Sequence, residues 1–367
     1  MVELKRVQLD GFRSIRSAEV NFRALNIMIG ANGAGKSNFV AFFKMMNEMM
    51  GGRLQQYIST SGRAQSNLYL GPKVTPQMSA QLEFETETGL DTYYMRLFHA
   101  AGDSLVFAEE RLSFRRTGWP RPQEVSLGPG HQETQIGDLA NQGNPVARTF
   151  RHLLNNCRVF HFHDTSQTAH VRQYHYVGNH RFLMPDAANL APVLYRWKQE
   201  HEPVYRRIVK TIQQVAPFFE GFELEPERNS SDIILNWRHK KSDFVFGPHQ
   251  LSDGTLRAIC IISLLLQPED ELPNLIVVDE PELGLHPYAL NVVASLFQAA
   301  ANHAQVLIST QSSTFLDNFE PEDIVLVERE GESSKFSQPN AEALEMWLQD
   351  YSLGEVWEKN VMGGGPH

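Results

Sequence analysis

The stretch "GANGAGKS" at residues 30–37 decides the fold class of this chain. It follows "LNIMI" (25–29), an apolar segment typical of a buried strand, and leads into "KSNFVAFFKMMNEMM" (36–50), which has the apolar density of a helix. Its glycines let the backbone turn so that consecutive N–H groups point at phosphate oxygens. Lys36 would place a positive charge on those phosphates, and Ser37 would offer a hydroxyl to Mg²⁺. Strand, glycine-rich turn and helix in this order predict an α/β nucleotide-binding fold rather than a turn without function.

A second motif, "LIVVDEPE" (275–282), supplies two consecutive carboxylates at the end of an apolar strand. Neighbouring strand residues point to opposite faces, so Asp279 and Glu280 cannot do the same work. Asp279 fits the carboxylate on the Mg²⁺ side, and Glu280 fits the group that orients and deprotonates an attacking water. The alternative, two carboxylates that only cap the next helix, would be preferred if residues 30–37 were absent.

A third stretch, "VLISTQSS" (306–313), is apolar up to Ile308 and then small and polar. This pattern is typical of a buried strand that delivers polar groups to a site at its C-terminal end. Gln311 is the largest side chain of the polar part, so it is the candidate functional group there.

Hydrophobic periodicity and composition predict the secondary structure of the rest of the chain. Period-two alternation over 78–116 predicts an antiparallel meander, and the Gly-, Pro- and Asn-rich 117–147 predicts a long irregular connection. Residues 186–216 predict two helices broken near Pro203. In the last third we expect helices at 252–267, capped by Ser252, and at 287–302, with 323–330 as the final strand of the sheet and "VMGGGPH" (361–367) as a flexible or docking tail.

Composition indicates a cytoplasmic globular protein. The 367 residues carry a formal net charge of −10, which argues against a surface that is basic throughout, and the densest basic stretches, 115–123 and 237–241, are short. No apolar run is long enough for a membrane span, so no membrane partner is expected. Cys157 and Cys260 are the only cysteines, which favours a reducing compartment over a disulfide framework.

The order of the motifs "GANGAGKS", "LSDGT" (251–255), "LIVVDEPELGLHP" (275–287) and "STQSS" (309–313) resembles ABC-type ATPases. The nearest branch is the RecF/SMC-like group, in particular stand-alone ATPases related to the overcoming-lysogenization-defect family, and "LKRVQLDGFRSIRSAEVNF" (4–22) is similar to its first strands. The resemblance implies an α/β ABC-type P-loop ATPase head with an antiparallel β meander in lobe I and a helical insertion before lobe II. The expected segments are lobe I (1–165), the insertion (166–245), lobe II (246–335) and a C-terminal helix and tail (336–367).

The resemblance also implies site residues. ATP would be held by Gly30, Ala31, Asn32, Gly33, Ala34, Gly35, Lys36, Ser37, Asn38 and Arg13. "LSDGT" (251–255) resembles the signature motif of the family, although Asp253 and Thr255 replace its usual third and fifth residues. In this signature loop, Ser252 and Gly254 would face the γ-phosphate of ATP held by a second subunit. Gln311 stands where ABC transporters have a histidine. Gln167, in "HDTSQTAH", is the expected metal-linked glutamine between the lobes, beside Ser37 and Asp279.

The function implied is ATP binding and hydrolysis with Mg²⁺ in a homodimer, or a higher oligomer, that sandwiches two ATP molecules. Anti-phage defence with a separately encoded nuclease or toxin is the preferred setting; the alternatives are a RecF-type DNA-repair ATPase and an ATP-bound sensor with very slow turnover, and nucleic acid is a further candidate partner. No sustained coiled coil supports DNA bridging. A metal site in the histidine-rich 161–180 is weighed against local hydrogen bonding, which is preferred.

Overall fold

The computed structural model describes residues 2–226 and 230–365. The chain forms two compact units. Unit 1 contains residues up to Val159, Pro273–Val277 and the residues from Gln305 onward, and unit 2 contains Phe160–Leu272 and Val278–Ala304. The two units therefore interleave along the chain.

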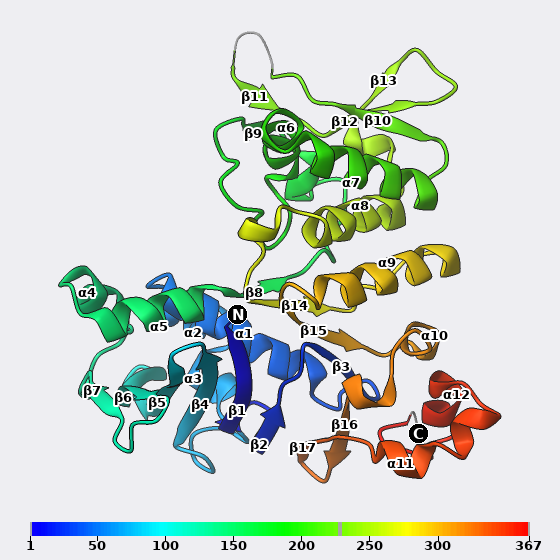
Figure 1. Cartoon of the computed structure of the whole chain (residues 1–367). Helices are drawn as coiled ribbons and strands as arrows, with labels where there is room; N and C mark the ends of the chain where they lie inside the picture. Colours follow the sequence, from blue (N-terminus) through cyan, green and yellow to red (C-terminus); the bar gives the residue numbers. More distant parts are fainter. Residues whose placement is uncertain (1, 227–229, 366–367) are drawn as a thin grey trace. The chain divides into compact units, whose positions relative to one another are not determined.

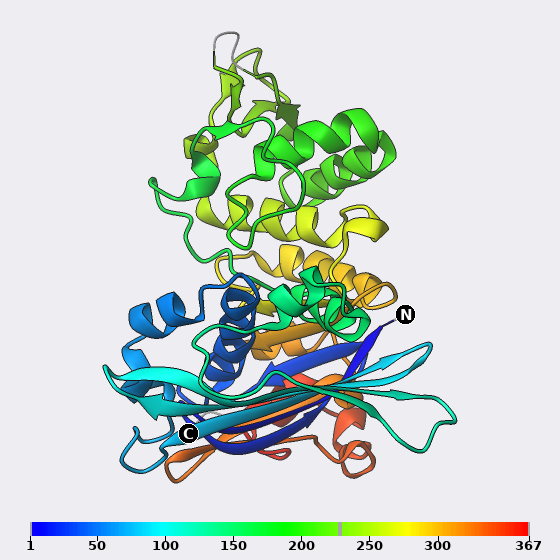
Figure 2. The same ribbon diagram turned by 90° about the vertical axis from the view of Figure 1, so that its left-hand side faces the viewer.

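Unit 1 contains an antiparallel sheet whose strand order is β2-β1-β4-β5-β6-β7. Its long strands, in blue to cyan, are seen in Figure 2. The bounds are Glu3–Phe12 (β1), Ile15–Asn21 (β2), Gln77–Thr86 (β4), Gly89–Ala100 (β5), Ser104–Arg116 (β6) and Gln123–Ser126 (β7). Every other residue of β4 and β5 is buried, so the alternation over 78–116 correctly predicted the meander.

A second sheet carries the predicted motifs and has the order β17-β16-β3-β15-β14-β8. Strand β3 pairs in parallel with both β15 and β16 (Figure 1). The bounds are Leu25–Ile29 (β3), Cys157–Phe160 (β8), Leu275–Asp279 (β14), Gln305–Thr310 (β15), Ile324–Glu330 (β16) and Ser333–Ser337 (β17). The prediction that 323–330 ends the sheet was wrong, because β17 pairs antiparallel with β16 through a tight return at Gly331 (φ 59°).

The core of unit 1 forms around helix α1 (Lys36–Met50), which buries Phe39, Phe42 and Phe43 against one another and against residues of the antiparallel sheet. The other helices here are α2 (Leu54–Thr60), α3 (Arg63–Asn67), α4 (Ile136–Asn141) and α5 (Pro145–Asn155). The irregular connection predicted for 117–147 was therefore wrong in part, since it contains β7 and α4. Its polar composition hides the few side chains, Ile136 and Ala140, that anchor α4 in the core.

Unit 2 is mainly helical, with α6 (Leu190–Glu200), α7 (Glu202–Val215), α8 (Asp253–Leu265) and α9 (Pro287–Ala300). The predicted break near Pro203 lies at His201, between α6 and α7, and Pro203 sits in the first turn of α7, where its missing N–H costs no hydrogen bond. Short strands form a three-stranded sheet, β10-β12-β13 (Phe219–Glu223, Asn236–His239, Val245–Phe246), and the pair β9 (His175–Tyr176) and β11 (Asp232–Ile233).

The end of the chain is also part of unit 1 and forms the short helices α10 (Ser313–Leu316), α11 (Ala341–Leu344) and α12 (Leu353–Glu358) (Figure 1). Trp357 Nε1 donates to Gly364 O at 2.8 Å, and Gly364 N donates to Glu328 Oε1 on β16 at 2.8 Å. Up to Gly365 the predicted tail is therefore docked. Among the described residues, no helix has both the length and the apolarity needed to cross a membrane.

Candidate nucleotide site

The phosphate loop of unit 1, residues 30–37, is shaped by close backbone contacts. A Cβ atom on Gly30 would overlap with Val327 O, and one on Gly35, which has φ 118°, would overlap with Ser334 Oγ. Gly33 also has positive φ (79°), but no atom lies near its missing side chain. Lys36 is buried, and its Nζ donates to Gly30 O at 2.6 Å and to Ala31 O at 3.1 Å. The loop thus curls around its own ammonium group, which is the charge expected to meet phosphate.

Two polar residues at the start of α1 follow this loop. Ser37 is exposed, so its hydroxyl is accessible, as a magnesium ligand must be. Asn38 Nδ2 donates to Ser14 Oγ at 2.7 Å, and Ser14 Oγ lies 2.7 Å from Ser334 Oγ. Together with the Gly35 contact, these bonds tie the loop to the β1–β2 turn and to β17.

Arg13 lies in that β1–β2 turn with φ 50°, an uncommon conformation for a residue with a side chain. Its Nη2 donates to Tyr57 Oη at 3.0 Å, and its Nε donates to Asn67 Oδ1 at 3.2 Å. Arg13 and Asn38 both line a cavity of about 410 Å³. This shared cavity is compatible with the predicted role of Arg13 beside a nucleotide, which stays a prediction.

Gln311 follows β15 directly. Thr310, the last residue of β15, pairs with Ile29, the last residue of β3, in a parallel register. Gln311 and Gly30 are therefore the residues that leave two neighbouring strands at the same edge of the sheet, which brings Gln311 to the start of the phosphate loop. Ser312 then caps α10 by accepting from Phe315 N at 3.1 Å.

In unit 2, Asp279 and Glu280 follow the buried part of β14. Asp279 Oδ1 is buried and has no hydrogen-bond partner among the described residues. A buried carboxylate oxygen without a donor is unfavourable, so this atom fits a group that binds Mg²⁺ directly or through water. Glu280 has φ 44°, a strained conformation of the kind that collects at functional sites.

The signature loop lies at the start of α8. Ser252 caps this helix as predicted, because its Oγ accepts from Thr255 N at 3.2 Å. Thr255 Oγ1 lies 2.8 Å from the same oxygen, which gives the unusual fifth signature residue a structural role. A Cβ atom on Gly254 would overlap with Gly284 O, so this glycine also permits the loop 282–287 to pack on the start of α8.

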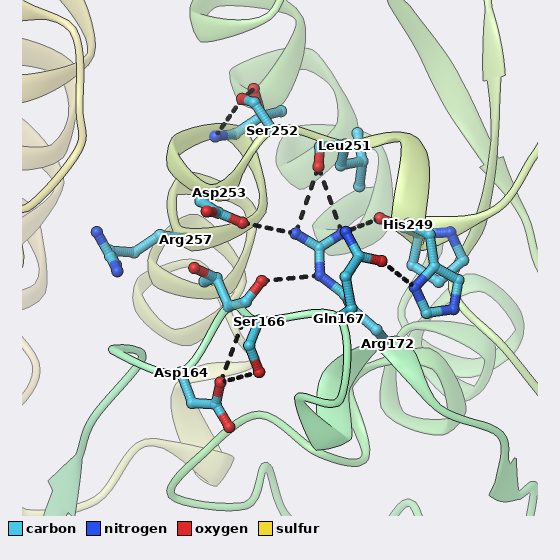
Figure 3. A network of polar contacts seen from close by, with 12 residues as sticks. Asp164, Ser166, Gln167, Arg172, His249, Leu251, Ser252, Asp253 and Arg257 are labelled. Atoms are coloured by element: carbon cyan, nitrogen blue, oxygen red, sulfur yellow. Dashed lines mark hydrogen bonds and ion pairs between the residues drawn. The ribbon is translucent and has the colours of Figure 1, made fainter.

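Arg172 holds the signature loop and was missed by the sequence analysis. Figure 3 shows its guanidinium among backbone carbonyls from two segments. It donates to Thr165 O (3.0 Å), to Leu251 O (3.3 Å) and to Pro248 O, and its Nη2 lies 2.9 Å from Asp253 Oδ1. The unusual third signature residue, Asp253, is thus the ion-pair partner of a buried arginine. Nothing in "HVRQY" marks Arg172 as buried.

Arg257 makes a second link from the same helix. Its Nε donates to Phe162 O at 2.9 Å, Nη2 to His163 O at 3.2 Å, and Nη1 to Leu283 O. Burial lowers the pKa of its guanidinium from the ordinary value, although an arginine stays charged at neutral pH. The start of α8 is therefore fastened to the loop after Glu280 and to residues 162–163.

The segment 161–180 also contacts the end of β14 and the residues next to the signature loop. His163 Nε2 lies 2.8 Å from Asp279 O, and Gln167 Oε1 lies 3.1 Å from His249 Nδ1, next to the signature loop. The role of Gln167 toward a metal stays a prediction. No cluster of three or more His, Cys, Asp or Glu side chains suited to a metal occurs in the described ranges, so the alternative metal site has no support.

Comparisons with known proteins identify the family and the fold of this chain. A family model described as "AAA domain, putative AbiEii toxin, Type IV TA system" matches residues 25–317. A comparison with curated proteins finds no match. Among solved structures, an SmcHead bound to the C-winged helix domain of ScpA gives a TM-score of 0.60 at 14% identity and covers 91% of this chain and 97% of its own. An Smc head domain bound to the C-terminal domain of ScpA, from Pyrococcus furiosus, gives 0.60 at 13% identity, with 95% and 99% covered. These likenesses establish the fold of an ABC-type, SMC-like P-loop ATPase head.

Proposed function

Since the chain belongs to the AAA-domain family of the AbiEii type, with an SMC-like head fold, we propose that it binds and hydrolyses ATP. The observation that carries this proposal is the phosphate loop, where Lys36 is enclosed by the carbonyls of Gly30 and Ala31. A buried ammonium group that donates to loop carbonyls is suited to exchange these two hydrogen bonds for hydrogen bonds to the oxygens of a triphosphate.

The other candidates take separate roles in this proposal. Ser37 and Asp279 would hold Mg²⁺, and the orphaned Oδ1 of Asp279 supports this assignment. Bound Mg²⁺ would neutralise the phosphate oxygens during transfer. Glu280 would orient the attacking water and take its proton. Gln311 would donate a hydrogen bond to the γ-phosphate through its amide N–H, and its amide oxygen would accept one from the attacking water.

The proposal includes a homodimer built around ATP. The chain has one phosphate loop and one signature loop, and Ser252 and the N–H groups at the start of α8 form the anion-binding end of a helix of 13 residues. A second copy would supply this end to the γ-phosphate, so that ATP holds the dimer together until it is hydrolysed.

A cytoplasmic regulatory ATPase with a separately encoded effector is the setting that we favour, with nuclease or toxin as the effector class. Two observations support it: the family description refers to toxin–antitoxin systems, and the SMC heads of similar fold are bound to a domain of ScpA. The second candidate is a DNA-repair ATPase, which would show DNA-stimulated turnover and salt-sensitive DNA binding.

The test uses two substitutions in the purified full chain. We expect Glu280→Gln to lower ATP turnover by about 10²–10⁴-fold, because the substitution removes the general base. The variant protein should still bind ATP and should accumulate as the ATP-bound dimer. We expect Lys36→Ala to abolish ATP binding and the dimer with it. Turnover of Glu280→Gln at the wild-type rate would show that the base is misassigned, and a wild-type turnover rate at background with tight ATP retention would favour a sensor.

A further inference from the structure

The C-terminal segment exposes a group of large apolar side chains. Met346 is 78% exposed, Trp347 is 40% exposed, and Tyr351 is also exposed; the Trp347 and Tyr351 rings lie 5.8 Å apart. We call these three residues the C-terminal patch. They follow one another on a short segment between α11 and α12, and exposed aromatic and methionine side chains that gather in this way are typical of protein-contact surfaces.

The surroundings of the patch are acidic. Residues 340–360 carry five carboxylates against one cation, Lys359, whose Nζ lies 4.9 Å from the Tyr351 ring centroid. All five carboxylates are exposed, and none belongs to an ion pair among the residues that the structure describes: Glu342, Glu345, Asp350, Glu355 and Glu358.

The combination of exposed apolar side chains and acidic surroundings indicates which kind of partner would bind the C-terminal patch. Acidic rims repel nucleic acid and anionic lipid, and a second copy of the same face would bring like charges together. A partner that offers apolar side chains flanked by lysine or arginine would satisfy both parts of the surface. An amphipathic helix with a basic border is the compact element that presents this arrangement.

The segment is also connected to the end of β15, where Gln311 lies. Helix α12 packs on α10 (Figure 1). Gly354 N donates to Asp317 Oδ1 at 2.7 Å. A Cβ atom on Gly354 would overlap with Ser313 O, so the two helices are in backbone contact. Ser313 is the first residue of α10 and lies two residues after Gln311.

We propose that the C-terminal patch is a docking site for a basic amphipathic helix of a partner protein, and that a partner bound there alters ATP turnover by moving α12, α10 and Gln311. The docking part stands on the surface alone. The coupling part rests on the proposed function, because Gln311 affects turnover only if the chain hydrolyses ATP.

The docking test uses a synthetic amphipathic helix of leucine and lysine as the probe. We expect calorimetry to show binding that weakens with added salt, and a loss of about tenfold or more in Trp347→Ala and in the double variant Glu345→Lys/Asp350→Lys. The matched control is Trp119→Ala, which removes another exposed tryptophan of unit 1, at 63% exposure, from a basic stretch. Equal binding of the same peptide with glutamate in place of lysine, or equal weakening by Trp119→Ala, would overturn the proposal. A change of oligomeric state caused by the patch substitutions without peptide would also overturn it, since the occupant would then be a second copy.

The coupling test measures steady-state ATP turnover with saturating peptide. We expect the peptide to change kcat in the wild type and to leave kcat unchanged in Gly354→Ala, although the peptide still binds. Asp317→Ala, which removes the hydrogen bond without adding an atom to the interface, is the second variant if Gly354→Ala does not fold. A peptide effect of the same size in both variants would disprove the coupling. A failure of the Glu280→Gln test would remove only this arm and leave the docking result interpretable.

Discussion

The phosphate loop of unit 1 and the signature loop of unit 2 present the same chemical feature and are held by different means. Each offers backbone N–H groups at the start of a helix. The phosphate loop is fixed by glycines whose missing side chains let other atoms come close. The signature loop is fixed by Arg172, which is 1% exposed and lies 79 residues before Leu251 in the chain. Its guanidinium donates to Leu251 O of the loop and to Thr165 O of its own segment. A short motif can therefore specify the first loop, whereas the second depends on residues outside its motif.

The first prediction concerns the phosphate loop and has the largest expected effect. Gly35→Ala should reduce ATP affinity by about a hundredfold or more, because its Cβ would overlap with Ser334 Oγ in a conformation that is already left-handed. Gly33→Ala is the matched control, since it has the same sign of φ and open space around its missing side chain. Titration with a fluorescent ATP analogue measures both.

If Gly35→Ala and Gly33→Ala weakened ATP binding equally, the positive φ of the glycines alone would explain the loss of affinity. Close packing of the loop against Ser334 would then play no part. A further test combines Gly35→Ala with Ser334→Gly, which removes the two nearest overlapping atoms and leaves Ser14 Oγ in place. We expect this second change to restore part of the ATP affinity of Gly35→Ala.

The second prediction concerns the signature loop. Arg172→Ala should destabilise unit 2 by about 3 kcal/mol and lower ATP turnover, since it leaves the buried carbonyls of Thr165 and Leu251 without a donor. Asp253→Ala should cost less than about 1 kcal/mol, because the Asp253 side chain is 68% exposed and solvent replaces its ion pair. Thermal unfolding and steady-state kinetics measure the two effects.

Arg172→Lys separates positioning from simple packing. A lysine retains the charge but cannot reach several carbonyls with one planar group, so turnover should stay low even if part of the stability returns. An Asp253→Ala variant as damaged as Arg172→Ala would show that the ion pair, rather than the carbonyls, holds the loop.

The same difference explains what the sequence could predict. The strand 25–29 and helix 36–50 were predicted with their observed bounds, because a glycine-rich loop and dense apolar flanks specify them locally. These features depend on residues that are close together in the sequence.

The parts that sequence reasoning missed depend on distant partners. The burial of Arg172, the contact between Gly254 and Gly284, and the hydrogen bond of His163 with Asp279 O all join segments that are far apart in the chain. Strand β17 was missed because "SSKFS" has few apolar residues, and its pairing with β16 fixes it instead. A single sequence contains no signal for such pairings.

The last prediction concerns Gln311 and has the smallest expected effect. Glutamine donates and accepts hydrogen bonds but carries no titratable proton, so wild-type turnover should show no pKa near that of histidine that originates at this position. Gln311→Ala should lower kcat by about tenfold, which corresponds to the loss of one hydrogen bond.

Gln311→His should keep much of the turnover but lose activity as pH falls below about 6.5, because protonation removes the acceptor nitrogen that would face the attacking water. Other histidines, including His163 and His249, are present in both proteins, so the difference between the two pH–rate profiles isolates position 311. Identical pH–rate profiles, or unchanged turnover of Gln311→Ala, would show that the end of β15 plays no part in the chemistry. The phosphate loop would then act without Gln311, although the parallel pairing of β15 with β3 places this residue beside the loop.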